Sequence, residues 1–257
     1  MISENTMQSL KREGLIIHKN EDLACWNNFK DVIDKSTAEF FKNSSPTALD
    51  AGKLNSVRLN AFRALNAQES WDKNYYKMAS ELLDALFGPD LLIQRKLNLS
   101  IQMPNDKSSI LGMHTDTLSG QSPFEFVMWT AFTKGYDTNS MFYFDRQTSE
   151  EIFYEMADYE VEGLEALRLK YWSKAKFLNV NASDVVLFSG TLFHGNVVNE
   201  TNETRISINC RFKNLFSPAG KTKSADRGVG IFYKLLSESV ATEIGREYLS
   251  RNLNFEL

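Results

Sequence analysis

The sequence has few of the residues that stabilise secreted proteins or anchor membrane proteins. It contains only two cysteines, Cys25 and Cys210, in 257 residues. Two distant cysteines form neither a disulfide framework nor a CxxC zinc pair, and such scarcity is typical of a reducing compartment. No run approaches the roughly 18 consecutive apolar residues of a membrane span, and the polar N-terminus has no apolar signal-peptide core. We therefore expect a soluble, cytoplasmic protein.

The chain also lacks an excess of positive charge. It has 29 Lys and Arg against 33 Asp and Glu, a formal net charge of -4, which disfavours a nucleic-acid-binding function. Hydrophobic residues make up 42% of the chain and charged residues 24%, as in ordinary globular proteins. No linker divides the sequence, so we expect a single domain over residues 1–257.

The N-terminal part, residues 1–90, has the apolar periodicity of helices. Trp26, Phe29 and Ile33 lie on one stripe of a predicted helix over residues 22–42. A second predicted helix begins at Ser70, a plausible N-cap, and ends at Phe87 before a Gly-Pro pair. The C-terminal tail, residues 215–257, is predicted to be helical over 229–249.

The core between these parts, residues 91–214, changes to the alternating pattern of β-strands. Strands are predicted at 91–103, 124–132, 140–144, 176–180, 184–188, 194–198 and 205–212, with one helix at 161–174. Units of alternating strand and helix are absent, so a parallel doubly wound sheet is disfavoured. The sequence predicts a mainly β protein with flanking helices, built as a β-barrel or a double-sheet jelly roll.

Histidine is scarce, and two of the three histidines lie in segments that point to metal chemistry. His114 and Asp116 are two residues apart, so extended backbone would direct both side chains to one face. His194 follows a hydrophobic strand and a glycine-containing turn. Two histidines and one carboxylate form the facial triad of non-haem Fe(II) oxygenases. The third histidine, His18, has no other ligand type near it and is expected to be structural.

An arginine and a serine eleven and thirteen residues after His194 complete the pattern. Arg205 and Ser207 share one face of a predicted strand. A guanidinium and a hydroxyl together can hold a carboxylate deep in a barrel. The far carboxylate of an α-keto dicarboxylate fits this pair, while its keto-acid end would chelate the metal.

This ordered set, His-x-Asp, a distal His and Arg-x-Ser, resembles the Fe(II)/2-oxoglutarate-dependent dioxygenase superfamily. The segment from Asp184 through Ser189-Gly190 and His194-Gly195-Asn196 to Arg205-Ile206-Ser207 is similar to the phytanoyl-CoA dioxygenase-like branch, and closer still to bacterial carbohydrate-biosynthesis oxygenases of the streptomycin-pathway type. The resemblance covers residues 91–212. It implies a double-stranded β-helix, a cupin-like jelly roll.

The same resemblance implies the cofactors and the residues that bind them. Fe(II) would be held by His114, Asp116 and His194, and the co-substrates would be 2-oxoglutarate and dioxygen. Arg205, Ser207 and Gln102 would bind 2-oxoglutarate, with Gln102 at its keto-acid end. The expected reaction is hydroxylation of a small polar metabolite, with a carbohydrate or nucleotide-sugar of surface-polysaccharide or secondary-metabolite biosynthesis as the favoured substrate.

Several alternatives stay open from the sequence. The same chemistry is compatible with an amino acid, an amine or an acyl substrate, and a cupin-like metal or small-molecule binding protein without turnover is a further candidate. Arg205 is alternatively a surface residue paired with Glu200 or Glu203, in which case Arg211 is the next candidate to anchor the co-substrate. Arg58 and Arg63 are candidates for an anionic group of the substrate, although a solvated helix face is the simpler interpretation. Residues 120–123, residues 133–139 and the tail are candidate lids.

Overall fold

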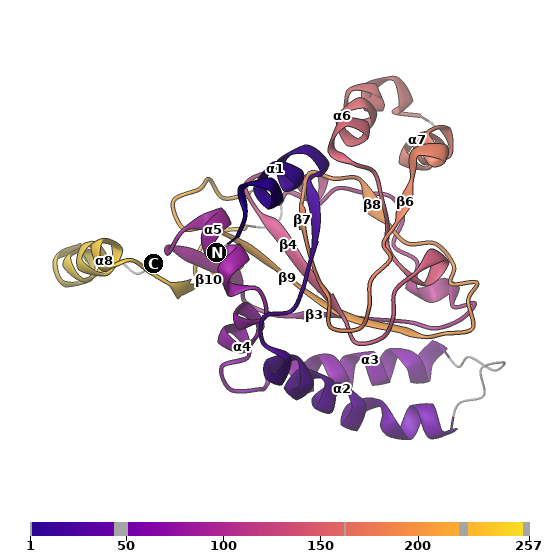
Figure 1. The fold of residues 1–257 in the computed structure, drawn as a ribbon, viewed down its shortest axis with the longest axis horizontal. Coiled ribbons are helices and arrows are strands. Elements are labelled where there is room, and N and C mark those ends of the chain that lie inside the picture. The colour runs from indigo at the N-terminus through magenta and orange to yellow at the C-terminus, as the bar shows by residue number, and fades with distance from the viewer. Residues whose placement is uncertain (1, 44–50, 162, 221–225, 254–257) are drawn as a thin grey trace.

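A computed structural model describes residues 2–43, 51–161, 163–220 and 226–253. Two antiparallel sheets form its centre (Figure 1). In spatial order, the larger sheet consists of β1 Leu15–His18, β7 Val185–Ser189, β4 Phe126–Ala131, β9 Arg205–Asn214, β2 Leu91–Gln94 and β10 Tyr233–Ser237, with β3 Asn98–Gln102 paired to the first half of β9. The smaller sheet consists of β6 Lys176–Phe177, β5 Phe142–Tyr143 and β8 His194–Gly195. Among the described residues, the strand pairings do not close into one barrel.

Helices lie on both sides of these sheets. Those before β2 are α1 Glu4–Glu13, α2 Leu23–Asn43, α3 Ala51–Asn66, α4 Trp71–Lys77 and α5 Ser80–Phe87. Those after β5 are α6 Arg146–Glu155, α7 Gly163–Tyr171 and α8 Val240–Leu253. In Figure 1, α2 and α3 run together below the large sheet, whereas α6 and α7 lie above, beside β6 and β8. Among the described residues, no helix is both long and apolar enough to cross a bilayer.

Strand β9 shows how the sequence separates core from site. Its side chains alternate across the sheet, as in any strand. One set is apolar and joins the helix-facing core, namely Ile206, Ile208, Cys210 and Phe212. Between these lie Arg205, Asn209 and Arg211, which line a cavity on the other face. A single ten-residue strand therefore stabilises the fold with one face and supplies polar side chains with the other.

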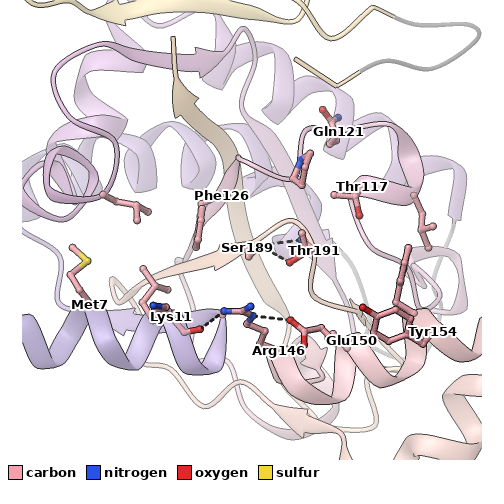
Figure 2. A pocket seen from close by; sticks show the side chains of 17 residues that line it. Met7, Lys11, Thr117, Gln121, Phe126, Arg146, Glu150, Tyr154, Ser189 and Thr191 are labelled. Carbon is pink, nitrogen blue, oxygen red and sulfur yellow. Dashed lines mark hydrogen bonds and ion pairs between the residues drawn. The ribbon is translucent and has the colours of Figure 1, made fainter. Parts of the chain in front are cut away.

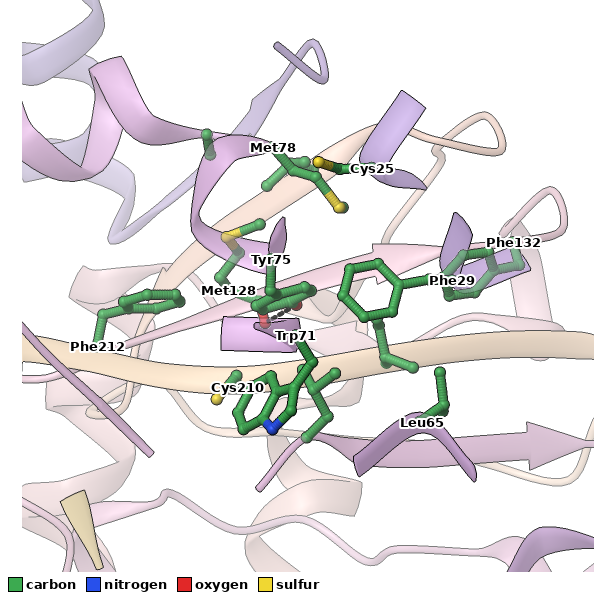
Figure 3. Close-up of a cluster of buried hydrophobic side chains, with 14 of the residues drawn as sticks. Cys25, Phe29, Leu65, Trp71, Tyr75, Met78, Met128, Phe132, Cys210 and Phe212 are labelled. Atoms are coloured by element: carbon green, nitrogen blue, oxygen red, sulfur yellow. Dashed lines mark hydrogen bonds between the residues drawn. The ribbon is translucent and has the colours of Figure 1, made fainter. Parts of the chain in front are cut away.

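The helix-facing core is rich in aromatic and sulfur-containing side chains (Figure 3). Tyr75 of α4 is fully buried there, and its ring stacks against Phe212 at a centroid distance of 6.2 Å. Its hydroxyl donates to the backbone carbonyl of Met128 at 2.8 Å, so its polar atom is satisfied. Cys25 and Cys210 are buried free thiols in this core, as expected for small hydrophobic residues.

Two short segments near the termini form strands where the sequence predicts helix, whereas α8 confirms the second half of the predicted helix over 229–249. Residues 15–18 form β1, which pairs with β7, and residues 233–237, predicted as part of a helix, form β10, which pairs with β2. Tyr233 at the start of β10 is fully buried. Both segments become strands because they pair with the edges of the sheet. This pairing supplies hydrogen bonds and burial that cannot be inferred from the local hydrophobic pattern.

The predicted helix over 70–87 is divided into α4 and α5. Ser70 makes no side-chain capping bond, and its φ of 53° is left-handed. The carboxylate of Glu21 instead accepts from the backbone N–H of Glu81 and the hydroxyl of Ser80. A side chain 60 residues away thus caps α5 and fixes the break. Helix α3 lies in the part predicted to be helical, although no bounds were predicted for it, whereas α6 was not predicted. The predicted strand 91–103 is divided into β2 and β3.

Candidate metal and co-substrate site

His114, Asp116 and His194 come together between the two sheets. One ligand atom from each lies within 4.8 Å of the others, and this is the only such group found among the described residues. His114 and His194 form an isolated antiparallel bridge, with backbone N–H to carbonyl distances of 3.0 and 2.9 Å. The bridge joins two segments 80 positions apart and brings the imidazole rings to a centroid distance of 4.3 Å.

The hydrogen bonds of the two imidazoles leave one nitrogen of each ring free. His114 Nδ1 lies 2.9 Å from the carbonyl of Gly112, and His194 Nδ1 lies 2.9 Å from the carbonyl of Leu192. Because a carbonyl only accepts, Nδ1 carries the proton in both rings. The lone pair on each Nε2 is then available to a metal, and the backbone fixes the ring orientation.

Burial and charge set the protonation states expected of metal ligands. Burial, together with the neighbouring His114, lowers the pKa of His194 to about 4, so this imidazole is neutral near pH 7. Burial alone would raise the pKa of Asp116, but the charge of Arg211 and of both histidines, together with the hydrogen bonds from Arg211, holds it below its usual value. A neutral histidine and an ionised carboxylate are the forms that bind a divalent cation.

Arg205 is a buried cation without an anionic partner. Its side chain donates to the Asn139 carbonyl at 2.8 Å, the Ser207 hydroxyl at 2.5 Å and Gln102 Oε1 at 2.9 Å. All three acceptors are neutral, and no ion pair forms between Arg205 and any described residue. Burial, with the charge of Arg58 nearby, lowers the pKa of Arg205 to about 10. The interpretation of Arg205 as a surface residue paired with Glu200 or Glu203 is therefore wrong, since it is only 4% exposed.

One cavity of about 300 Å³ joins this arginine to the His-Asp-His group. Its walls include all three candidate ligands, Arg205 and Trp129. Residues from both sheets line it, so it lies between them. Trp129 contributes to both core and cavity, with its ring centroid 6.0 Å from the guanidinium of Arg205. The three candidate ligands and Arg205 thus line one cavity, as the sequence pattern requires.

Two predicted binding residues lie beside Arg205. Ser207 and Gln102 are both fully buried and both accept from the Arg205 fork. Gln102 also donates to the carbonyl of Val197 at 2.6 Å. We expected Gln102 at the keto-acid end of 2-oxoglutarate, next to the metal. In the structure Gln102 contacts Arg205, and neither Gln102 nor Ser207 is among the residues that line the cavity.

The remaining candidates have structural partners. Arg58 forms a 2.7 Å ion pair with Asp106 and donates to the Ile101 carbonyl, which ties α3 to β3. Its side chain is only 18% exposed. Arg58 therefore fits neither the interpretation as a substrate-binding residue nor that of a solvated helix face. Arg63 is exposed. His18 lies 2.9 Å from Glu21 and belongs to no group of candidate metal ligands found among the described residues.

A set of charged residues around Asp116 was not identified from the sequence. Arg211 Nη2 and Nε lie 2.7 and 3.2 Å from the two carboxylate oxygens of Asp116. Glu125 and Tyr233 lie behind Arg211 and hydrogen-bond to one another. Arg211 is six residues after Arg205 and so on the same strand face, which made it the next candidate to anchor 2-oxoglutarate, but its contact with Asp116 was not predicted. No sequence pattern indicated Glu125 or Tyr233, which come from other parts of the chain.

A second cavity, of about 960 Å³, adjoins the segment that follows Asp116 (Figure 2). Thr117 and Gln121 from this segment line it, so residues of the candidate lid 120–123 form part of its wall. In Figure 2, Met7 and Lys11 of α1 and Arg146, Glu150 and Tyr154 of α6 lie in a row along one side of the pocket, opposite Gln121 and Thr117. Arg146 bridges the two helices, donating to the Lys11 carbonyl at 3.1 Å and to Glu150 at 3.0 Å.

The close contact between the His114 and His194 segments depends on a glycine. A Cβ on Gly195 would lie 2.8 Å from the Leu111 carbonyl oxygen and 2.9 Å from the Phe142 ring. We expect Gly195→Ala to force these segments apart, destabilising the protein by about 1–3 kcal/mol and weakening metal binding. Gly112→Ala is the matched control, because nothing lies within 4 Å of its added Cβ. Equal unfolding midpoints for the two variants in urea would contradict this account.

Glu125 gives the site a pH-dependent stability. Burial, with the charge of Asp116, raises its pKa from 4.5 to about 7, although Tyr233 and Arg211 oppose the shift. Because the folded-state pKa is raised, this carboxyl's contribution to stability is full below about pH 4.5 and is lost as the pH rises through 7. We expect the unfolding free energy of Glu125→Gln to improve relative to the native protein by about 2–3 kcal/mol between about pH 5 and pH 8. Urea unfolding of both proteins at the two pH values measures this change. If the difference in unfolding free energy between them is the same at both pH values, the pKa of Glu125 is not raised by folding.

No protein-family model matches the chain, and no curated protein matches it. Solved structures, however, have the same fold. SnoK, a non-haem α-ketoglutarate-dependent carbocyclase from nogalamycin biosynthesis, is 12% identical with a TM-score of 0.57, covering 92% of this chain and 97% of SnoK. HygX from Streptomyces hygroscopicus, solved with nickel and 2-oxoglutarate, is 10% identical with a TM-score of 0.55, covering 91% and 98%.

EctD from S. alaskensis, solved with 2-oxoglutarate and 5-hydroxyectoine, is 17% identical with a TM-score of 0.56. The match covers 85% of this chain and 78% of EctD. At such identities the likeness shows that the chain shares the fold of these non-haem, 2-oxoglutarate-binding proteins. It extends well beyond residues 91–212, where the sequence resemblance was found.

Proposed function

We propose that this protein is a non-haem Fe(II)/2-oxoglutarate-dependent oxygenase. The observation that carries the proposal is the single cavity that joins a His-Asp-His group to a buried arginine without an anion. A buried charge is costly unless it is paired, so Arg205 fits a site completed by an anionic ligand. Iron bound by the three ligands would supply activation of dioxygen coupled to decarboxylation of 2-oxoglutarate.

In this proposal each residue has a distinct task. His114 and His194 offer Nε2, and Asp116 offers a carboxylate oxygen, to the metal. Arg205 binds the far carboxylate of 2-oxoglutarate, while Ser207 and Gln102 hold the guanidinium in place. The two sheets would be the halves of a double-stranded β-helix, with β8 of the small sheet and β9 of the large sheet supplying His194 and Arg205.

The cavity lining favours an uncharged, hydrogen-bonding substrate. Its charged side chains are Asp116, Arg205 and Arg211, and each has an observed or proposed partner. The other polar side chains there are neutral amides and hydroxyls, including Asn98, Ser100 and Asn209. We therefore favour hydroxylation of an uncharged polar metabolite such as a carbohydrate, or of the sugar ring of a nucleotide-sugar whose charged diphosphate lies outside this cavity, over an amino acid, amine or acyl substrate.

The test is succinate formation from 2-oxoglutarate by the purified protein. We expect slow, Fe(II)-dependent succinate release without substrate and faster release with the true substrate in a panel of sugars, nucleotide-sugars, amino acids and acyl compounds. His18→Ala should behave as the native protein because His18 lies outside the site. Binding of iron without any succinate release would instead favour a non-catalytic binding protein.

A further inference from the structure

Arg211 contacts Asp116 more closely than any other side chain does. Nη2 donates to Oδ1 at 2.7 Å and Nε donates to Oδ2 at 3.2 Å, so both carboxylate oxygens meet the planar guanidinium. The Arg211 side chain is 15% exposed and that of Asp116 is 5% exposed. Such a fork fixes the plane of a carboxylate, which a single contact does not.

Two further side chains, Gln94 and Glu125, contact Arg211, and Tyr233 in turn contacts Glu125. Arg211 Nη1 donates to Gln94 Oε1 of β2 at 3.1 Å, and its Nε lies 3.4 Å from Glu125 Oε1. The hydroxyl of Tyr233, on β10, donates to the other oxygen of Glu125. These hydrogen bonds use three of the five N–H groups of Arg211, and its charge lies between two carboxylates.

We propose that Arg211 is the positioning residue of Asp116, and that Glu125 sets how strongly its positive charge acts on the metal site. The proposal rests on the oxygenase function proposed above, in which Asp116 binds the metal. The guanidinium fork fixes the carboxylate in one orientation, and the charge of Arg211 opposes the incoming cation. Glu125 offsets that charge.

This arrangement predicts effects of opposite sign on metal affinity. Removing the cation with Arg211→Met relieves repulsion of a divalent ion, so the affinity should rise by about tenfold or more. Removing the counter-charge with Glu125→Gln exposes the ion to an uncompensated Arg211, so the affinity should fall by about three- to tenfold. A merely structural role for these buried residues predicts weaker binding in both variants.

Arg211→Lys separates the charge from the fork. Lys keeps the positive charge but cannot offer two parallel N–H donors to a carboxylate. We expect its metal affinity to stay within about threefold of the native protein. Its coordination geometry should nevertheless change, because Asp116 is no longer held in one plane.

The experiment is titration of the native protein and the three variants with Co(II) alone, at about pH 8, where Glu125 is ionised. Visible absorption of Co(II) reports both affinity and coordination geometry, and circular dichroism checks folding. Arg205→Met is the matched control, an arginine of the same strand that contacts no candidate ligand, and it should leave the Co(II) spectrum unchanged.

Weaker binding in both Arg211→Met and Glu125→Gln, or a native Co(II) spectrum in Arg211→Lys, would overturn the proposal. If Arg211→Met does not fold, Glu125→Gln decides, and unchanged or tighter binding there overturns it. If the native protein binds Co(II) but neither binds nor turns over 2-oxoglutarate, the proposed oxygenase function is wrong. The role of Arg211 in metal binding is still tested by the same Co(II) titrations.

Discussion

Replacing Asp116 with alanine is expected to abolish succinate formation and to weaken Fe(II) or Co(II) binding by more than about 100-fold. This variant removes the only carboxylate among the three proposed ligands, and it leaves the charge of Arg211 without its main counter-charge beside the metal. Asp116 is also the main partner of Arg211, so the variant should lose some stability as well. Metal titration monitored together with thermal unfolding separates the two effects.

His18→Ala is the control for the metal prediction. His18 pairs with Glu21 on the far edge of the large sheet and belongs to no described metal-binding group. It should keep native metal affinity and turnover. His194→Ala should behave like Asp116→Ala. Full succinate-coupled turnover in Asp116→Ala would refute the ligand assignment.

Arg205→Ala is expected to weaken 2-oxoglutarate binding by roughly two to four orders of magnitude. Breaking a buried charge pair costs about 3–5 kcal/mol, and each tenfold in affinity is about 1.4 kcal/mol. Metal affinity should change little, because Arg205 contacts no candidate ligand. Arg205→Lys should recover only part of the loss, since lysine lacks the planar fork. The measurement is a 2-oxoglutarate titration of the metal-loaded protein without oxygen.

The stability of the same variant distinguishes a binding role from a structural one. Arg205 is buried against neutral acceptors, so its removal should not lower the melting temperature sharply in the absence of 2-oxoglutarate. Arg58→Met is the matched control. It breaks the ion pair with Asp106, so it should destabilise the protein while changing 2-oxoglutarate affinity by less than about tenfold. A sharp fall in the melting temperature of Arg205→Ala with unchanged 2-oxoglutarate affinity would instead show that Arg205 is a structural residue.

The sequence predicted those parts of the site that lie on short local patterns. Arg205 and Ser207 are two residues apart on β9, and strand geometry brings them to one face. His114 and Asp116 are also two residues apart, but His114 lies in an isolated bridge and Asp116 has helical φ and ψ at the turn that follows. The hydrogen bonds that complete the site join distant segments. Arg211 meets Asp116 across 95 positions and Glu125 meets Tyr233 across 108, and no local periodicity reports such contacts.

The fold shows the same division between local and distant information. Helix α2 was predicted almost to its ends because its apolar stripe is long and regular. Strands β1 and β10 were missed because each is only four or five residues long and is defined by pairing with β7 or β2. The break between α4 and α5 depends on Glu21, far from the helix it caps.

Anaerobic addition of 2-oxoglutarate to the Fe(II)-loaded protein tests the central claim most directly. Chelation of iron by the keto acid produces a visible charge-transfer band, and its growth reports the affinity of the pair. The account predicts a saturable band in the native protein, no band in Asp116→Ala, and a band in Arg205→Ala only at roughly 100-fold or higher concentrations of 2-oxoglutarate. No band in native protein that has bound iron and been given saturating 2-oxoglutarate would contradict the account.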